Sequence, residues 1–420
     1  MPEFLELYPG VRLTAVQSSR FRTGCFRVSF LSPLRSETAA RNALIPDLLL
    51  RGCRTCPDPT AVSRFLDDAC GASVGGLVRK HGQIQTAGIY AAFLEDAVAQ
   101  EPLLERLCGF VHDLLFEPLV TAGAFDPAGF AVECANLRSA MRAEKNDKAL
   151  YAIRQLCRNM FCGEPYAVPA SGEEEDLDRI TPKNLYEQYR ALLAHAPAEV
   201  FYMGSETPQR AAELLRGMLR PLAGRSCESM PQPVFRAPGP VRSLTETGDL
   251  TQARLAVGFR TPIPQTLDEL AAAQVFTAVY GGSYRSRLYL RMREEASLCY
   301  AVSASLDRRE GAMFVTAGID AEQTEPALTE IRRQLALCAA GGIGSDELDQ
   351  AKALLISGLR GVRESPGRME EFYAGVSLGG PAGSIEDRAA AIGRVTAEQA
   401  SAFAAAARED FVYLLKGAET

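Results

Sequence analysis

Histidine is the scarcest of the chemically versatile residues in this sequence. The 420 residues include three histidines, His81, His112 and His195. No two of them are four residues apart, so they cannot share one helix face as the ligands of a helical zinc site do. We interpret each as a solvated or core-edge residue. A histidine-based metal site or a Ser-His-Asp mechanism would need them gathered from distant parts of the chain.

Cysteine is the other candidate nucleophile or ligand, with eleven residues. Most lie in apolar segments, which is typical of small buried hydrophobes rather than of a disulfide framework. Cys53 and Cys56 form one C-x-x-C, but no second pair or nearby histidine completes a zinc site, so a structural role is favoured over a redox role. Cys108 and His112 are four residues apart on a predicted helix. Packing explains this spacing more simply than catalysis does.

Composition and charge exclude several classes of function. The chain is 47% hydrophobic and 23% charged, with a formal net charge of -7. An acidic balance argues against a broad phosphate-binding surface, so we expect no nucleic-acid partner. No apolar run approaches the ~18 residues of a membrane span, and the first residues show no basic region followed by an apolar run. We therefore expect no membrane association and a cytoplasmic location.

The chain exceeds the ~250–300 residues at which a single core stops growing, and its periodicity predicts two similar halves. In the first half we expect a hairpin over 11–34, helices over 37–51 and 59–71, strands within 76–93, helices over 96–115, 126–161 and 181–193, and a strand over 199–204. In the second half we expect a strand over 251–260, a helix over 267–279, paired strands over 300–306 and 312–319, helices over 323–340, 345–364 and 396–407, and a strand over 410–416.

An internal repeat supports this division. Thr181 and Thr396, about half the chain apart, each follow an Arg-Val/Ile pair and begin a helix that leads into an apolar strand. A threonine N-cap followed by helix and strand, in register in both halves, indicates a duplicated domain. We predict an N-terminal domain over 1–224, a proline-rich linker over 225–242 and a C-terminal domain over 243–420.

These two halves, together with LLLRGCRTCPDPTAVSRFLDDACGASVGG at residues 48–76, resemble the insulinase-like (M16) metallopeptidase family and its mitochondrial-processing-peptidase relatives. The resemblance extends over nearly the whole chain in element order. It implies an α+β fold made of two homologous α/β domains, with antiparallel-rich sheets flanked by helices.

The family's peptidases carry the motif H-x-x-E-H just before the matched stretch, where two histidines bind zinc and the glutamate is the general base. The corresponding positions are Ala43, Pro46 and Asp47, and the position that matches the third ligand, a glutamate on a later helix, is Ala140. An alanine has no lone pair to offer, and a proline cannot accept a proton. The resemblance therefore implies no catalytic residues, no metal site and no cofactor in this chain.

Two carboxylates flank Ala140 on the same predicted helix. Glu133 lies roughly two turns before it and Glu144 one turn after it, so a small register error would make one of them a candidate ligand. Without the two histidines, either would face an empty site. We interpret both as solvated helix residues.

The segment SRLYLRMREEASLCYAV, residues 286–302, follows two glycines and is similar to the family's S-R-L-x-x-x-L-R-E-x-x-x-L-x-Y segment. Arg293 and Tyr300 match an Arg/Tyr pair that in two-chain and fused members reaches the substrate in the partner's zinc site. A guanidinium can grip a peptide carbonyl or carboxylate with two donors, and a phenol supplies one more. The alternative is an ion pair of Arg293 with Glu294 or Glu295, and a Tyr300 that fills the core.

The resemblance implies a non-catalytic subunit of a heterodimeric zinc peptidase. Its partner would be an active M16 subunit that carries H-x-x-E-H and the zinc ion, and the two would share a peptide substrate. Among bacterial members the resemblance is to inactive chains found beside an active homologue, such as the YfmF-like proteins associated with elongation factor P modification. The alternatives are a non-proteolytic scaffold, like the core proteins of the respiratory bc1 complex, and a cysteine-dependent enzyme.

Overall fold

The computed structural model describes residues 2–375, 378–381 and 383–418. The chain divides into two compact units, and each unit is assembled from three segments. Unit 1 comprises Met1–Arg142, Val168–Pro231 and Val362–Leu378, and unit 2 comprises Ala143–Ala167, Gln232–Gly361 and Gly379–Thr420. These units follow packing rather than the sequence repeat, and the boundaries predicted from the repeat remain a prediction.

Unit 1 is built on a six-stranded sheet with the strand order β1-β2-β8-β3-β5-β4. Its strands are β1 Glu3–Tyr8, β2 Val11–Gln17, β3 Thr23–Pro33, β4 Ser73–His81, β5 Ile84–Leu94 and β8 Ala198–Gly204, and β6 Val120–Thr121 and β7 Ala124–Phe125 form a separate small ribbon. Its helices are α1 Ser36–Leu49, α2 Pro59–Asp68, α3 Asp96–Ala99, α4 Leu103–Phe116, α5 Pro127–Asn146, α7 Pro182–His195, α8 Pro208–Met218 and α12 Pro366–Tyr373.

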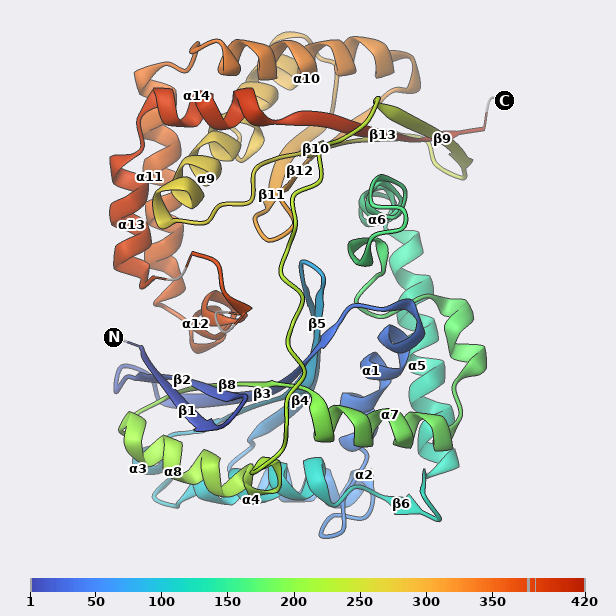
Figure 1. Ribbon diagram of the computed structural model, residues 1–420, viewed down its shortest axis with the longest axis vertical. Helices are drawn as coiled ribbons and strands as arrows, with labels where there is room; N and C mark the ends of the chain where they lie inside the picture. Colours follow the sequence, from blue (N-terminus) through green and yellow to red (C-terminus); the bar gives the residue numbers. More distant parts are fainter. Residues whose placement is uncertain (1, 376–377, 382, 419–420) are drawn as a thin grey trace. The chain divides into compact units, whose positions relative to one another are not determined.

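Strand β3 shows how this sheet is covered on both faces. Successive side chains of a strand point to opposite faces. Phe26, Val28 and Phe30 are buried in the core cluster that includes α1, α4 and α7, whereas Arg27 points to the other face, where α12 packs on β3 and β8. Figure 1 shows α12 on the face opposite α4 and α8. Burial on both faces explains why nearly every β3 residue is buried.

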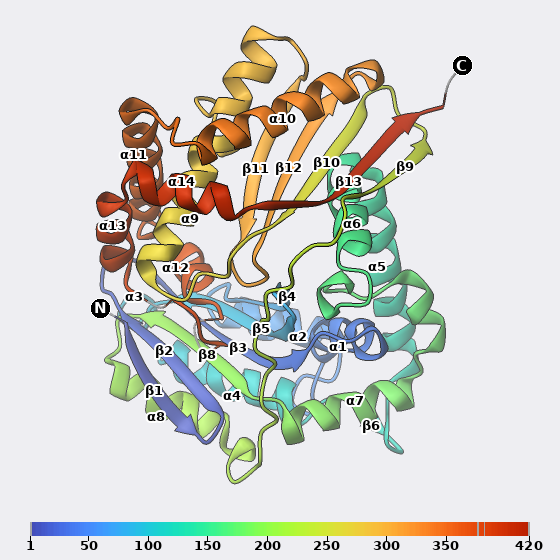
Figure 2. The same cartoon turned by 45° about the horizontal axis from the view of Figure 1, so that its top comes forward.

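Unit 2 is built on a five-stranded sheet with the order β11-β12-β10-β13-β9, which can be followed in Figure 2. Its strands are β9 Arg242–Gly248, β10 Ala253–Arg260, β11 Ala301–Asp307, β12 Ala312–Ile319 and β13 Arg408–Gly417. Its helices are α6 Lys148–Met160, α9 Leu267–Gly281, α10 Thr324–Ala339, α11 Ser345–Val362, α13 Ile385–Arg394 and α14 Ala397–Ala406.

The two sheets share one topology, which confirms the predicted duplication of an α/β fold with antiparallel-rich sheets. The order β2-β8-β3-β5-β4 in unit 1 corresponds to β9-β13-β10-β12-β11 in unit 2, and β1 is the additional strand. In both units the first strand of this order pairs in parallel with the second, and the remaining neighbours pair antiparallel.

Each sheet is covered on its second face by a helix from the other half of the sequence. Helix α6, from the first half, packs on β10 and β13 of unit 2. A Cβ at Gly258 of β10 would overlap the Met160 sulfur of α6, so the glycine allows this close approach. Helix α12, from the second half, packs on β3 and β8 of unit 1. The halves of the sequence thus exchange equivalent helices.

A buried ion network anchors the exchanged helix in unit 1. The Arg27 side chain on β3 is 1% exposed, its Nη2 donates to Glu199 on β8 at 2.9 Å, and its Nε lies 2.6 Å from Glu370 on α12. Arg79 on β4 adds two hydrogen bonds of 2.7 Å to the Glu370 carboxylate. The charge of each group is thereby offset within the network.

A matching network lies in unit 2. Arg260 on β10 donates to Asp410 on β13 at 2.8 Å and to Glu164, four residues after α6, at 2.6 Å. Arg242 on β9 donates to Asp410 at 3.0 Å. In both units, therefore, an arginine on the central strand joins a carboxylate of the next strand to one brought by the exchanged segment.

Three predicted elements are wrong. The single helix predicted over 96–115 is divided into α3 and α4, because Gln100 adopts a left-handed conformation and Pro102 follows it. Strands β2 and β3 do not form the hairpin predicted over 11–34, because β8 lies between them and pairs with both; the hairpin is β1–β2. The single helix predicted over 126–161 is divided into α5 and α6 at Asp147. The Asp147 carboxylate accepts hydrogen bonds from the backbone N–H groups of Ala149 and Leu150, so it caps α6 as an N-cap residue.

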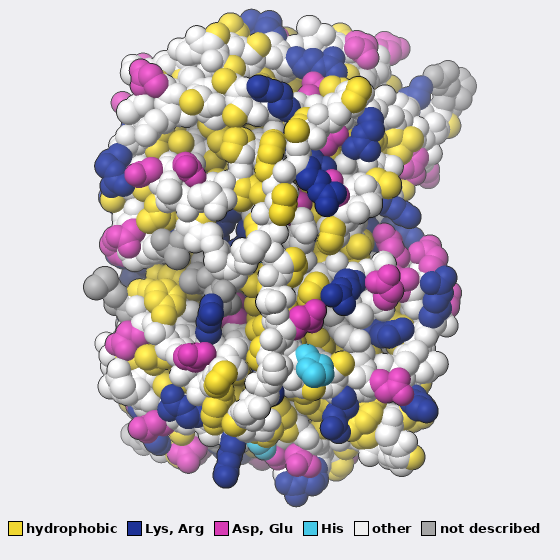
Figure 3. All heavy atoms as spheres, viewed as in Figure 1, with side chains coloured by type: hydrophobic (Ala, Val, Ile, Leu, Met, Phe, Trp, Pro, Cys, Tyr) yellow, Lys and Arg dark blue, Asp and Glu magenta, His cyan; other side chains and the backbone are white. Residues whose placement is uncertain are grey.

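The helix lengths and the surface charges can be compared with the sequence-based expectation of no membrane and no nucleic-acid partner. Among the described residues, none of the helices is long and apolar enough to cross a membrane. On the face seen in Figure 3, basic and acidic side chains are interspersed. That face offers no continuous basic surface for a nucleic-acid backbone.

Candidate functional site

Helix α1 holds the three positions that match the zinc motif. Ala43 and Pro46 are buried, and Asp47 is partly exposed, with its carboxylate lying against β4. Pro46 lies inside the helix, where its ring removes one backbone donor. The three side chains offer one carboxylate in total, so this helix face cannot supply the two ligands and the base of an H-x-x-E-H site.

The space beside Asp47 is occupied by strand β4. A Cβ at Gly76 would overlap Asp47 Oδ1 and lie 3.0 Å from the Pro46 Cβ. Partial burial raises the pKa of Asp47, and the nearby Glu133 carboxylate raises it further. Two acidic groups therefore lie near each other here, and the described residues contain no group of three or more histidine, cysteine, aspartate or glutamate side chains that could hold a metal.

Glu133, rather than Ala140, is the residue of α5 that faces α1. Its Oε1 accepts a hydrogen bond from Arg51 Nη1 at 2.9 Å, and its Oε2 accepts one from Asn136 at 2.9 Å. Ala140 is exposed, and Glu144 pairs with Arg154 at 3.0 Å. Glu133 is thus engaged with an arginine that follows α1, and Arg51 provides the positive charge beside this carboxylate.

A buried amide network stabilises the same helix and was not indicated by the sequence. Asn42, which is fully buried, donates to Ser32 at 3.0 Å and to Gln85 at 2.9 Å. Gln188 of α7 donates to the Asn42 carbonyl oxygen at 2.8 Å, and Gln85 donates to the Ala39 carbonyl at 2.9 Å. Buried amides with satisfied partners fix the position of α1. This polar face of α1 is held by hydrogen bonds to β3, β5 and α7.

The cysteine candidates lie in environments that disfavour the thiolate. Cys53 and Cys56 are both buried, and the pKa of Cys56 is raised, chiefly by burial. Burial also raises the pKa of Cys108 to about 12. The His112 Nδ1 lies 2.6 Å from the Met218 carbonyl oxygen, and its ring packs on Phe116. A reactive cysteine needs a lowered pKa, so these residues do not support a cysteine-dependent enzyme.

Arg293 lies in a π-helical turn, η4, that spans Tyr289–Glu295. Its side chain is 42% exposed, and its guanidinium lies over the Tyr289 ring at 5.0 Å from the ring centre. The Arg293 Nε is 3.8 Å from Glu294 Oε1, a solvent-exposed pair that contributes little. Glu295 pairs instead with Arg291. The guanidinium is therefore presented on an aromatic ring with most of its donors available.

Tyr300 directly precedes β11 and is not part of the core, since 57% of it is exposed. Its hydroxyl donates to Asp320 at 3.2 Å, and the Asp320 charge raises the pKa of Tyr300. Burial raises the pKa of the neighbouring Cys299 thiol to about 11, and the positive charge of Arg293 partly offsets this rise. The Arg293 guanidinium therefore lies close to Cys299, just before the start of β11. Tyr289 and Asp320 were not singled out in the sequence; the spacing of Tyr289 four residues before Arg293 was the available signal.

Comparisons with known proteins assign a family to this arrangement. A family model described as the peptidase M16 inactive domain matches residues 179–355. The probable inactive metalloprotease YmfF of Bacillus subtilis (strain 168) is 26% identical over 429 residues, which cover 99% of this chain and 98% of the relative. The chain is thus similar to M16 peptidase homologues of the inactive type. The resemblance noted in the sequence is confirmed, whereas the YfmF-like name and the association with elongation factor P modification stay predictions.

Solved structures share the fold of this chain. A conserved protein from Enterococcus faecalis V583 matches with a TM-score of 0.89 at 25% identity, over 99% of this chain and 98% of that one. A peptidase M16 inactive domain from Pseudomonas fluorescens matches with a TM-score of 0.79 at 16% identity, over 100% of this chain and 99% of that one. The two-domain M16 architecture is therefore the fold of this chain.

Proposed function

We propose that this M16 homologue is the non-catalytic subunit of a heterodimeric zinc peptidase. Its partner is an M16 chain that carries H-x-x-E-H and the zinc ion, and this chain contributes Arg293 and Tyr300 to the binding of the peptide substrate. The observation that carries the proposal is that both side chains are exposed near β11. The zinc-motif positions on α1 offer a single carboxylate and so cannot form a zinc site in this chain.

The chemistry of the two side chains fits an extended peptide. The Arg293 guanidinium lies on Tyr289 and is paired only weakly with Glu294, so it can donate two parallel hydrogen bonds to a carbonyl or a carboxylate. The Tyr300 hydroxyl donates its one proton to Asp320 at 3.2 Å. Its oxygen can therefore accept a hydrogen bond from a peptide N–H, and it donates to a peptide carbonyl only in exchange for Asp320. A peptide in extended conformation presents alternate carbonyls at the spacing that such donors need.

Zinc does not fit this chain itself. The α1 positions that match the motif supply a methyl group, a pyrrolidine ring and one carboxylate, and Glu133 already accepts hydrogen bonds from Arg51 and Asn136. A zinc site needs three or four nitrogen, sulfur or oxygen ligands in tetrahedral geometry. We expect the purified chain to hold no stoichiometric zinc and to hydrolyse no peptide. Elemental analysis and a peptidase assay check this, and about one tightly bound zinc per chain would contradict it.

The pairing is tested by co-expression with an M16 chain of similar length that contains H-x-x-E-H and is encoded beside this one. We expect the two chains to sediment as one heterodimer with zinc-dependent peptidase activity. Two species that sediment separately at micromolar concentration would contradict the pairing. An encoded neighbour without zinc ligands would favour the scaffold alternative.

The contribution of Arg293 is tested in that complex. We expect Arg293→Ala to leave pairing and folding intact and to lower turnover by roughly 30- to 1000-fold, since the loss of a positioned charged donor costs on the order of 2–4 kcal/mol. Tyr300→Phe removes one neutral donor and should cost on the order of 0.5–1.5 kcal/mol.

The matched control is Arg285→Ala, at an exposed arginine that directly precedes the matched segment 286–302. Turnover and melting temperature are measured for all three variants. Unaltered turnover in the Arg293→Ala complex, or an equal loss in the Arg285→Ala complex, would remove the role of the Arg/Tyr pair and leave this subunit as a scaffold.

A further inference from the structure

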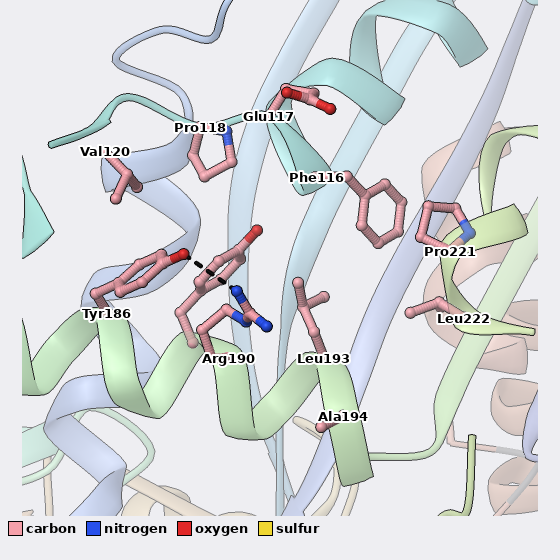
Figure 4. A pocket seen from close by; sticks show the side chains of 11 residues that line it. Phe116, Glu117, Pro118, Val120, Tyr186, Arg190, Leu193, Ala194, Pro221 and Leu222 are labelled. Atoms are coloured by element: carbon pink, nitrogen blue, oxygen red, sulfur yellow. Dashed lines mark hydrogen bonds between the residues drawn. The ribbon is translucent and has the colours of Figure 1, made fainter. Parts of the chain in front are cut away.

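A pocket of about 370 Å³ lies in unit 1, outside every position discussed so far. One wall is helix α7, which supplies Tyr186, Arg190 and Leu193 at the i, i+4, i+7 spacing of one helix face. The opposite side includes Phe116 at the end of α4 and Leu222, which Figure 4 shows across from Arg190. Its size and its aromatic and aliphatic walls suit a small ligand, and polar groups of Glu117, Tyr186, Tyr189 and Arg190 also line it.

The charges in this pocket do not balance. Its lining contains two charged side chains, Glu117 and Arg190. The exposed Glu117 carboxylate forms a solvent-exposed ion pair with the Arg54 guanidinium, 3.6 Å away. The exposed Arg190 guanidinium makes one hydrogen bond, from Nη1 to the Tyr186 hydroxyl at 3.3 Å, and among the described residues its charged or polar neighbours are the Tyr186 and Tyr189 phenols rather than a carboxylate. The uncompensated charge in the pocket is positive, which favours an anionic ligand.

Tyr186 supplies a second donor beside this charge. Its hydroxyl accepts from Arg190, so its own proton remains available to a ligand. Its ring is held edge-on by Phe125, with ring centres 5.5 Å apart. The neighbouring Tyr189 is different, because its hydroxyl donates to the Leu115 carbonyl at 2.6 Å. The pocket therefore offers an anion one guanidinium and one positioned phenol.

We propose that this pocket binds a carboxylate attached to a single apolar side group, the chemistry of a C-terminal apolar amino-acid residue. The carboxylate is held by Arg190 and Tyr186, in the manner in which guanidinium groups grip carboxylates. The apolar side group lies against Phe116, Leu193 and Leu222. This site is independent of the zinc-peptidase pairing and of Arg293, so its failure and the failure of the proposed function are distinguishable.

The test is isothermal titration of the purified full chain with N-acetyl-L-phenylalanine and with its C-terminal amide. We expect the acid to bind and the amide to bind roughly 10- to 100-fold more weakly, because it lacks the charge that Arg190 recognises. N-acetylglycine, which has the carboxylate without the apolar group, should also bind more weakly. Equal binding of acid and amide, or no binding of the acid, would overturn the proposal.

Variants assign the binding to this pocket. Arg190→Met should reduce the affinity for the acid roughly 10- to 100-fold, and Tyr186→Phe about 2- to 10-fold. The matched control is Arg64→Met, which removes the same charge from an exposed position on α2 and should leave the affinity unchanged. An equal loss in Arg64→Met would overturn the assignment.

A tetrapeptide with a C-terminal phenylalanine, compared with N-acetyl-L-phenylalanine, distinguishes a peptide C-terminus from a free carboxylic acid as the ligand. Tighter binding of a tetrapeptide than of N-acetyl-L-phenylalanine identifies a peptide C-terminus as the ligand. Binding of the single amino-acid derivative but not of the tetrapeptide overturns the peptide form and leaves a free carboxylic acid.

Discussion

At the scale of single residues, the most constrained side chains are two buried arginines. Arg27 and Arg260 are both less than 6% exposed, and each bridges two carboxylates on different elements. Burial of a charge is costly unless close partners offset it, so the loss of one member leaves the others in an unfavourable environment. These residues therefore determine whether the exchanged segments can bind their sheets.

We expect Arg27→Met to lower the free energy of unfolding by about 3–5 kcal/mol, because Glu199 and Glu370 would lose their shared buried partner. Urea unfolding followed by circular dichroism measures this. The control is Arg20→Met, whose exposed pair with Glu364 should contribute about 0–1 kcal/mol. Similar small losses in both variants would show that the buried network contributes no more than a surface pair.

At the scale of elements, the beginning of α11 depends on one carboxylate. Glu347 accepts a hydrogen bond from the Gly344 N–H at 3.0 Å and two from Arg287, at 2.9 Å and 2.6 Å. Burial raises the pKa of Glu347, but the Arg287 guanidinium and the Gly344 N–H outweigh it and hold the pKa below its ordinary value. An anion at a helix N-terminus is also favoured by the helix dipole.

This environment gives unit 2 a predictable response to acid. A carboxylate with a lowered pKa in the folded state stabilises the fold above its unfolded pKa of about 4.3, and this contribution is lost as the pH falls through the folded value. Glu347→Gln should cost about 1 kcal/mol at pH 7, after allowance for partial exposure, and nothing at strongly acidic pH.

The measurement is the free energy of unfolding between pH 3 and pH 7 for wild type and Glu347→Gln. Glu322→Gln, at an exposed position that makes no ion pair among the described residues, is the control. A difference between wild type and Glu347→Gln that does not change with pH would refute the role of ionised Glu347.

Local signals in the sequence predicted the positions of helices and strands better than they predicted which strands pair with each other. Thr181 and Thr396 cap α7 and α14 with reciprocal side-chain hydrogen bonds, as expected from residues within one helical turn. The hairpin over 11–34 failed because β8 enters between its two strands from a distant part of the chain. Hydrophobic alternation shows that a strand is buried, but not which strand lies beside it.

The candidate sites show the same limit. The family segment located Arg293 and Tyr300, and exposure of both side chains agrees with a role at the surface. Spacing along the chain did not predict that Glu133 would face α1. The pocket at Arg190 is visible in the sequence only as one face of α7; its opposite wall comes from segments before and after that helix.

At the scale of the whole molecule, the exchange of α6 and α12 makes neither half of the sequence self-sufficient. A fragment 1–231 lacks α12, so Arg27 loses Glu370, and a fragment 232–420 lacks α6 and Glu164, so Arg260 loses one of its partners. Each fragment would also expose the sheet face that the missing helix covers. The sequence predicted a helix over the residues of α6, within 126–161, but none over those of α12. The sheet that each of these helices covers depends on contacts with the other half.

We therefore expect the fragments 1–231 and 232–420, expressed separately, to lack a cooperative unfolding transition, and to form a folded complex when they are expressed together. The exchanged helices supply the missing buried surface and the missing carboxylates in the complex. Glu370→Ala in the second fragment should weaken the complex by about 3 kcal/mol, since it leaves Arg27 and Arg79 without their shared partner. Size-exclusion chromatography and urea unfolding measure both effects. Two fragments that unfold cooperatively on their own, with midpoints near that of the full chain, would show that the exchange is not required for the stability of either unit.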